Sequence, residues 1–404
     1  MSNRDNSGQI EVREPQTLWN IQFIMVIALG FITGSANHML YPILSGYALS
    51  LGASLALAGT IVGLMNGVAM FIRPLSGFAS DLFNRKYVMV GSCLVSAAAY
   101  VGYLVFASVT AIIICRIMQG IAFSFMSVAR TAYATEYMPK DKIGEGIAFT
   151  TFGIILSQAV GPVMGLWISD RWGHQTSFIL ALTLTLTGAA LTATLKHTHT
   201  KKPLNRNTIK FNNLIAVEVV PYALIAGLFV MINPIAHAFI ALVGAERNIA
   251  NVGLLFTVYS VCTLIMRPIS GRLLDKMDLP VLLYPAFVFA GITMVLLGSA
   301  HGIALVLLAG MTSALSQGIA VPAIQGSCIK RIGRERAGVV AATIYMGQDL
   351  LSTAAPPLGG FFVTNVGYRD MFYIFAAIML IGMLAYMFLR RNEKKRSPRD
   401  SKVV

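Results

Sequence analysis

Twelve apolar segments, each long enough to cross a lipid bilayer, follow one another along the 404 residues of the chain. Hydrophobic residues make up 56% of the sequence and charged residues only 12%, which is more apolar surface than a soluble domain can bury. This pattern predicts an all-α, polytopic membrane protein with 12 transmembrane helices. The expected segments lie at 20–46, 57–79, 88–108, 110–134, 144–167, 176–195, 213–240, 251–271, 280–300, 303–328, 337–363 and 370–389.

The sequence also repeats itself at an offset of 194 residues. Residues 71–81, FIRPLSGFASD, return at 265–275 as IMRPISGRLLD, with Arg, Pro, Ser, Gly and Asp at the same spacing. Both copies begin on the same side of the membrane, so the two six-helix halves are expected to be parallel repeats, as in many transporters that bind their cargo where the halves meet. The expected organisation is a tail at 1–18, a half at 19–195, a linker at 196–212, a second half at 213–390 and a basic tail at 391–404.

The positive charge is distributed unevenly between the two sides of the expected bundle. If the N-terminus is cytoplasmic, 24 of the 31 Lys and Arg residues fall in cytoplasmic loops and tails, against three outside, Arg171, Arg247 and Arg369. The positive-inside rule therefore places both termini in the cytoplasm. The net charge of +14 is explained in this way, with the basic tail lying against anionic lipid, and nucleic acid is not expected as a partner. The four cysteines are scattered on apolar segments, so neither a metal site nor a disulfide is expected.

The loop between the second and third segments, GFASDLFNRK at 77–86, carries the most specific motif. Gly77 allows close approach of a neighbouring helix, and Asp81 can accept hydrogen bonds from a helix N-terminus or pair with a base. With twelve segments and duplicated halves, the loop resembles the signature loop of the major facilitator superfamily, and the resemblance covers about residues 18–390. Leu82 replaces the usual basic residue and Asn84 the usual Gly, which Asn can match by adopting a left-handed conformation.

The resemblance implies that this loop is a conformational latch between the halves. Asp275, in the second copy, is expected to matter less because its loop lacks the paired bases. The expected members of the latch are Gly77, Asp81, Arg85, Lys86, Arg73 and Asp275.

The fourth segment carries Arg116 three residues before Gln119-Gly120, which looks like a second motif of the family. The family relates this Arg to proton coupling or substrate contact. A charge inside the membrane is costly and is a functional hypothesis by default, although an Arg bound to neighbouring carbonyls could simply brace the N-terminal half.

The fifth segment carries small residues at a spacing of four, which places them on one face of a helix. The pattern is similar to the Gly-Pro motif that this family associates with exporters. Its members are Gly153, Ser157, Gly161, Pro162 and Gly165.

Asp349 lies near the middle of the eleventh segment, where the first half has Ile155 at the 194-residue offset. Since the duplication does not require an acid here, Asp349 is the first candidate for proton coupling, with Glu218 as the second. The alternative is an Asp that is locked to a basic neighbour. The substrate cavity is expected to be lined by Arg116, Gln119, His38, Arg130, His237, Gln158 and Gln348, although Arg130 could instead pair with Glu136 and either His could be structural.

These features predict a secondary active transporter, a proton-coupled exporter of small organic molecules that works by alternating access as a monomer in the bacterial inner membrane. Several intramembrane bases against few acids leave a metallophore or organic-anion exporter as an alternative, and an importer as another. A membrane enzyme or sensor is remote, since the sequence has no catalytic cluster or phosphate loop, and no cofactor is expected.

Overall fold

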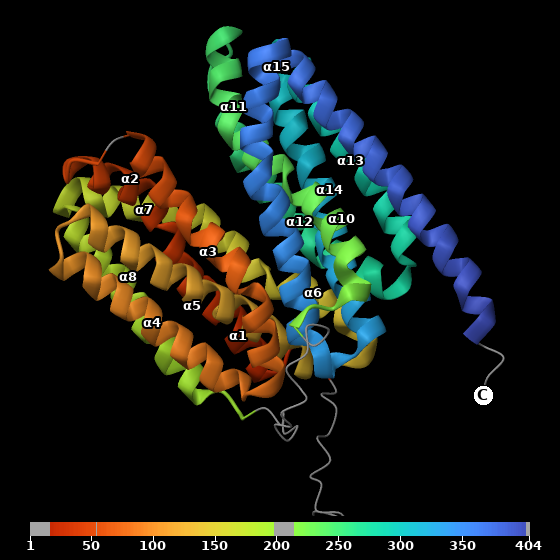
Figure 1. Ribbon diagram of the computed structural model, residues 1–404, viewed down its shortest axis with the longest axis horizontal. Coiled ribbons are helices and arrows are strands. Elements are labelled where there is room, and N and C mark those ends of the chain that lie inside the picture. The colour runs from red at the N-terminus through yellow and green to blue at the C-terminus, as the bar shows by residue number, and fades with distance from the viewer. Residues whose placement is uncertain (1–16, 54, 198–213, 401–404) are drawn as a thin grey trace, which may run out of the picture.

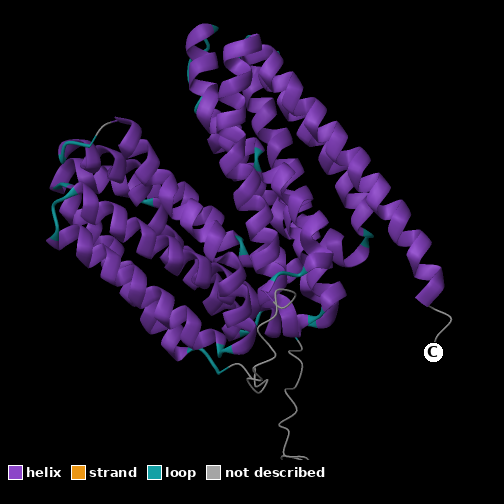
Figure 2. Ribbon diagram, in the orientation of Figure 1, coloured by secondary structure: helices purple, strands orange, loops and turns teal. Residues whose placement is uncertain are grey.

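The computed structural model describes residues 17–53, 55–197 and 214–400, and this part of the chain is helical with no strand (Figure 2). The expected all-α fold is confirmed. Most of the expected N-terminal tail and of the 196–212 linker lies outside the described residues. The expected basic tail continues the last helix as far as Asp400.

Each half contains a set of helices in the same order (Figure 1). The first half consists of α1 (Ile21–His38), α2 (Leu40–Ser50), α3 (Leu55–Leu82), α4 (Arg85–Val105), α5 (Val109–Glu136), η1 (Lys140–Lys142), α6 (Ile143–Thr150), α7 (Phe152–Trp172) and α8 (His174–Thr194). The second half consists of η3 (Val217–Val219), α10 (Val220–Val230), α11 (Ile232–Glu246), α12 (Leu254–Lys276), α13 (Leu279–Gly298), α14 (Ile303–Ile332), η4 (Arg334–Arg336) and α15 (Ala337–Asp400).

These helices make twelve membrane crossings. Ten of the described helical segments are long and apolar enough to span a bilayer. One of them, α15, contains two crossings, because Gly367 interrupts it with a left-handed φ of 83°. The 28-residue α3 is long enough to supply the remaining crossing.

The first crossing of each half is broken into two helices, and proline explains the break. α1 ends at His38, four residues before Pro42, which has no N–H to bond the His38 carbonyl. In the same way α10 ends at Val230, four residues before Pro234. The repeated break supports the duplication predicted from the sequence.

The two halves stand side by side, contact each other at one end and diverge toward the other (Figure 1). We call the contacting end the linker side, because it contains Lys196, the turn between α3 and α4, and the start of α15. Contacts between the halves run from α3 and α5 to α15 and from α6 to α12 and α14.

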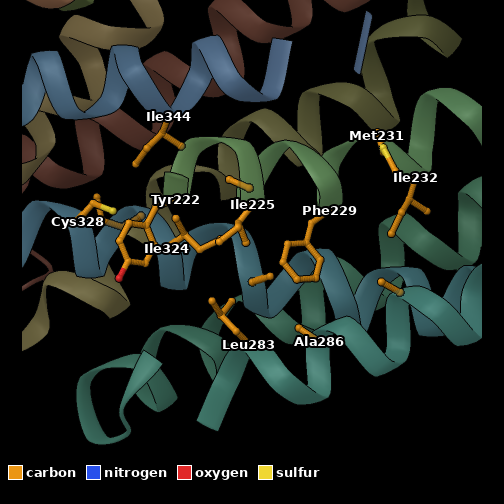
Figure 3. Packing of buried hydrophobic residues seen from close by; sticks show 14 of the residues in the cluster. Tyr222, Ile225, Phe229, Met231, Ile232, Leu283, Ala286, Ile324, Cys328 and Ile344 are labelled. Atoms are coloured by element: carbon orange, nitrogen blue, oxygen red, sulfur yellow. The ribbon is translucent and has the colours of Figure 1, made fainter. Parts of the chain in front are cut away.

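The apolar core of the second half is built around α10, whose side chains are apolar on every face. Tyr222, Ile225 and Phe229 on successive turns of α10 lie between α13 and α14, against Leu283 and Ile324 (Figure 3). Close packing of this kind resists deformation, so each half is suited to moving as a rigid body.

Candidate functional site

Asp81, at the end of α3, caps the first turn of α15 in the opposite half. Its carboxylate oxygens accept hydrogen bonds from the backbone N–H groups of Gly338 at 2.8 Å and Val339 at 2.9 Å. The N-terminus of a helix carries partial positive charge and unpaired N–H groups, so a carboxylate there stabilises the contact. The latch predicted from the sequence therefore has the geometry to hold the halves together on the linker side.

Glycine on both helices allows this approach. A Cβ added to Gly77 would lie 2.6 Å from the Cβ of Ala342, and one added to Gly338 would lie 2.9 Å from the carbonyl oxygen of Gly77. Neither position has space for a side chain, in agreement with the close helix approach expected at Gly77.

The second repeat makes the same contact in the reverse direction. Asp275, at the end of α12, accepts hydrogen bonds from the N–H groups of Gly144 and Glu145, both at 2.9 Å, and pairs with Lys330 of α14 at 2.6 Å. Gly144 and Glu145 correspond, at the 194-residue offset, to Gly338 and Val339, the residues that donate to Asp81. The loop of Asp275 lacks the paired bases, as the sequence indicated, but α14 supplies a basic partner in Lys330.

Arg85 fixes the α3–α4 turn to α5. Its guanidinium is fully buried, donates to the carbonyl oxygens of Ser80 (3.0 Å) and Ala132 (2.7 Å), forms an ion pair with Glu136, and lies 3.4 Å from Asp81.

Two possibilities that the sequence left open near this turn are not realised. Glu136 pairs with Arg85 and not with Arg130. Asn84 is extended (φ −62°) and not left-handed, and it acts as N-cap of α4, with its side chain accepting from the N–H of Lys86. Capping α4, rather than a left-handed turn, is thus what Asn contributes where the family has Gly.

Arg73 joins the halves closer to the middle of the bundle. Its Nε lies 2.9 Å from Oδ2 of Asp349, the Arg73 side chain is 3% exposed and the Asp349 side chain 17%. Nη1 donates to Ser127, and the guanidinium lies 4.8 Å from the ring centre of Tyr345. Arg73, expected as a polar part of the latch, thus contacts the other half through Asp349, and Asp349 has the basic neighbour that the sequence left open as the alternative to proton coupling. Their pairing brings the proposed proton carrier into contact with the first half.

The counterpart of Arg73 in the second repeat is Arg267, on α12. It is 8% exposed, and its Nε and Nη1 have no hydrogen-bond partner among the residues that the structure describes. The position that corresponds to Asp349 is occupied by Ile155. Arg267 was not among the site residues predicted from the sequence, although the repeat contains the signal that identifies it.

Arg116 is enclosed within the first half. Nη1 lies 3.1 Å from Oε1 of Gln119, which also accepts from the hydroxyl of Tyr103, and the guanidinium lies over the ring of Tyr41 at 5.5 Å. Within the described part of the chain, Nε and Nη2 of Arg116 have no hydrogen-bond partner. A side chain, and not backbone carbonyls, therefore braces Arg116.

The remaining cavity candidates are not gathered in one place. Arg130 is buried against α1, where a Cβ on Gly30 would lie 2.5 Å from its Nη1. His38 Nδ1 lies 2.8 Å from the carbonyl oxygen of Gly34 and 3.1 Å from Oγ of Ser157, which gives this His structural partners.

On the other elements, His237 is exposed and stacks on Phe256 at 3.7 Å between ring centres. Gln158 is exposed, whereas Gln348 is buried with Nε2 unpartnered. Glu218 is also exposed, beside Asp278 in a cavity of about 220 Å³ at the linker side. This places Glu218 far along the bundle from the Arg73–Asp349 pair.

The small residues of α7 pack against α1. A Cβ added to Gly161 would lie 2.9 Å from the Cβ of His38, and one added to Gly165 would lie 2.9 Å from the Cβ of Met39. Gly153 is similarly closed by the backbone of α1 at Ile27. The face of small residues expected from the sequence thus lets two helices of the same half approach closely, with Pro162 inside α7.

The duplicated twelve-crossing bundle with reciprocal caps agrees with the comparisons to known proteins. The model of the Major Facilitator Superfamily matches residues 26–352 and 219–403. The chain belongs to this family. It is accordingly a multi-pass membrane transporter of small molecules and not an enzyme, as the sequence predicted.

Similar proteins include the multidrug resistance protein MdtG of Escherichia fergusonii, 23% identical over 93% of this chain and 96% of that protein. The multi-drug resistance efflux pump PmrA of Streptococcus pneumoniae is 22% identical over 85% of this chain and 89% of that pump. Among solved structures, the transporter FucP in its outward conformation aligns with a TM-score of 0.77 at 16% identity, over 92% of this chain and 99% of that one.

Proposed function

We propose that this transporter exports small organic molecules and is driven by inward proton movement. The observation that carries the proposal is the Arg73–Asp349 ion pair, which joins the halves and has no counterpart in the second repeat. The names of the two relatives describe multidrug resistance and efflux, and the small-residue face of α7 supports the same direction of transport.

In this mechanism, Asp349 couples the proton to the movement of the halves. The charged carboxylate attracts Arg73 across the interface, and a proton on Asp349 removes that attraction. The caps at Asp81 and Asp275 must also open before the linker side can separate, and each contributes about 1 kcal/mol. Energies of this size allow one proton to shift the balance between two conformations.

The proposed location is the bacterial inner membrane, with the linker and both termini in the cytoplasm, as the positive-inside rule favours. With this orientation, the described arrangement is closed toward the cytoplasm and diverges outward. The proposed molecule is a monomer whose basic C-terminal end lies against anionic lipid.

The test compares two kinds of transport by purified protein in proteoliposomes. The cargo is a pair of xanthene dyes of opposite charge, carboxyfluorescein and rhodamine 6G. Asp349→Asn should abolish dye accumulation driven by a pH gradient but keep dye exchange at equal pH, because exchange requires only alternating access. Asp349→Glu should keep part of the driven transport, since its carboxylate still titrates. Glu218→Gln is the matched control, because it removes the charge of the second candidate for proton coupling. If Asp349→Asn accumulates dye as well as the wild type, the proposed coupling is wrong.

A further inference from the structure

We propose that Arg267 receives an anionic group of the transported molecule, so that the cargo class is organic anions. The inference deepens the proposed function, because it assigns a cargo to the transporter described above. It rests on a pair of corresponding positions in the two repeats that differ in charge: Asp349 faces Arg73, whereas Ile155 stands where an acid would face Arg267.

The match between the repeats is close on the linker side. Asp81 caps α15 at Gly338, and Asp275 caps α6 at Gly144, which is 194 residues earlier. Gly77 packs against Ala342 of α15, and its counterpart on α12 packs against Ala148 of α6 in the same way. The same 194-residue offset relates Arg73 to Arg267 and Asp349 to residue 155.

Residue 155 is not an acid. Ile155 is 7% exposed and offers no hydrogen-bond acceptor from its side chain. Among the residues that the structure describes, no carboxylate lies within ion-pair distance of Arg267, and its Nε and Nη1 are buried without a partner. A buried charge without a counter-ion is costly, so its retention is explained best if another molecule supplies the negative charge.

The position of Arg267 suits a cargo site. It lies one helical turn before Gly271, where an added Cβ would lie 2.6 Å from the Cα of Glu145 in the other half. It also occupies the position in its repeat that Arg73 occupies in the first repeat, where Arg73 contacts the opposite half. Arg267 is therefore near the interface between the halves, where alternating access can expose it to each side in turn.

Arg130 is a second buried cation without an acid. It is 5% exposed and precedes Thr131, whose hydroxyl lies 2.9 Å from that of Tyr345 in the opposite half, and no acid is paired with Arg130 in the described part of the chain. Two buried arginines without carboxylate partners favour a bound anion over a bound cation.

The test measures thermal unfolding of the full-length protein in detergent with benzoate, phenyl phosphate or citrate, and with benzylammonium and chloride as controls. We expect at least one organic anion to raise the melting temperature of the wild type, and benzylammonium and chloride not to do so. Arg267→Gln should weaken the binding of that anion at least tenfold. Ile155→Asp keeps Arg267 but supplies an internal carboxylate, so it should raise the melting temperature without ligand and also weaken anion binding. Ile155→Asn, similar in shape but uncharged, should bind the anion as the wild type does.

Three results would overturn the proposal. They are no stabilisation of the wild type by any of the organic anions, stabilisation that persists in both Arg267→Gln and Ile155→Asp, and equal stabilisation by chloride, which would mean an inorganic counter-ion only. The assay needs no pH gradient, so its outcome is independent of proton coupling. Conversely, gradient-driven transport of rhodamine 6G without anion binding would support the proposed function and contradict this cargo class.

Discussion

Nε of Arg73 lies 2.9 Å from Oδ2 of Asp349, and this ion pair joins the first half of the transporter to the second. In the described part of the chain no acid pairs with Arg267, the counterpart of Arg73, and Ile155 stands at the position that corresponds to Asp349. The two halves thus make equivalent contacts at their linker-side ends and differ in charge nearer the middle. A proton can weaken the contact between α3 and α15 without a matching effect between α12 and α7, the helix that contains Ile155.

The strength of the Arg73–Asp349 pair can be measured with a double-mutant cycle. Arg73→Gln should leave Asp349 without its partner and destabilise the protein by roughly 3 kcal/mol, since breaking one side of a buried pair strands the other charge. Arg73→Gln combined with Asp349→Asn should recover much of this loss, because no charge remains. Melting temperatures of the three variants in detergent measure the effect. Additive losses would show that the two side chains do not interact.

The crossing of α3 and α15 should not tolerate a methyl group at Gly338. Gly338→Ala places a Cβ 2.9 Å from the carbonyl oxygen of Gly77, so we expect the cap at Asp81 to be displaced and transport to fall severalfold. Gly360→Ala, in the same helix, is the matched control, because no atom lies within 4 Å of the added Cβ. At that position Ala should stabilise the helix by up to about 1 kcal/mol. Equal transport by the two variants would show that the close crossing is not needed.

The sequence predicted the fold well because its signals are local or periodic. Apolar length located the crossings, and the 194-residue repeat fixed the two halves and the glycine positions at Gly77 and Gly153. The breaks at His38 and Val230 follow from prolines four residues later.

Side-chain partners between distant helices could not be predicted in this way. Arg73 and Asp349 are 276 residues apart, and neither spacing nor periodicity indicates that they meet. Lys330 reaches Asp275 from another helix, which the loop sequence could not show. Arg267 could have been found, because the repeat that identified Asp349 as unmatched also leaves Arg267 without an acid.

The proposed orientation predicts which helix ends are accessible from outside intact cells. Arg171→Cys, at the end of α7, should react with an external membrane-impermeant maleimide, and Lys276→Cys, at the linker side, should react only after the membrane is permeabilised. Both positions are exposed, so access and not burial decides the result. A background in which the native cysteines are replaced removes interference from Cys262, which is half-buried. The reverse pattern of labelling would place the linker outside.

The two caps should be of similar importance, because each carboxylate accepts two backbone hydrogen bonds at the N-terminus of a helix in the opposite half. Asp81→Asn and Asp275→Asn each remove the charge but keep the size of the side chain, so each should weaken linker-side closure by about 1 kcal/mol. That corresponds to a several-fold shift toward the state open on the linker side, which maleimide access to a cysteine placed between the halves would measure.

Asp170→Asn, at the opposite end of the bundle and exposed, is the control for loss of an acid as such. It should leave closure unchanged, whereas the double variant Asp81→Asn/Asp275→Asn should shift closure by roughly the sum of the single shifts, because the two caps have no partner in common. A large effect at Asp81 with none at Asp275 would mean that the second cap opens easily in the membrane, and that the halves are held on one side of the pseudo-symmetric interface only.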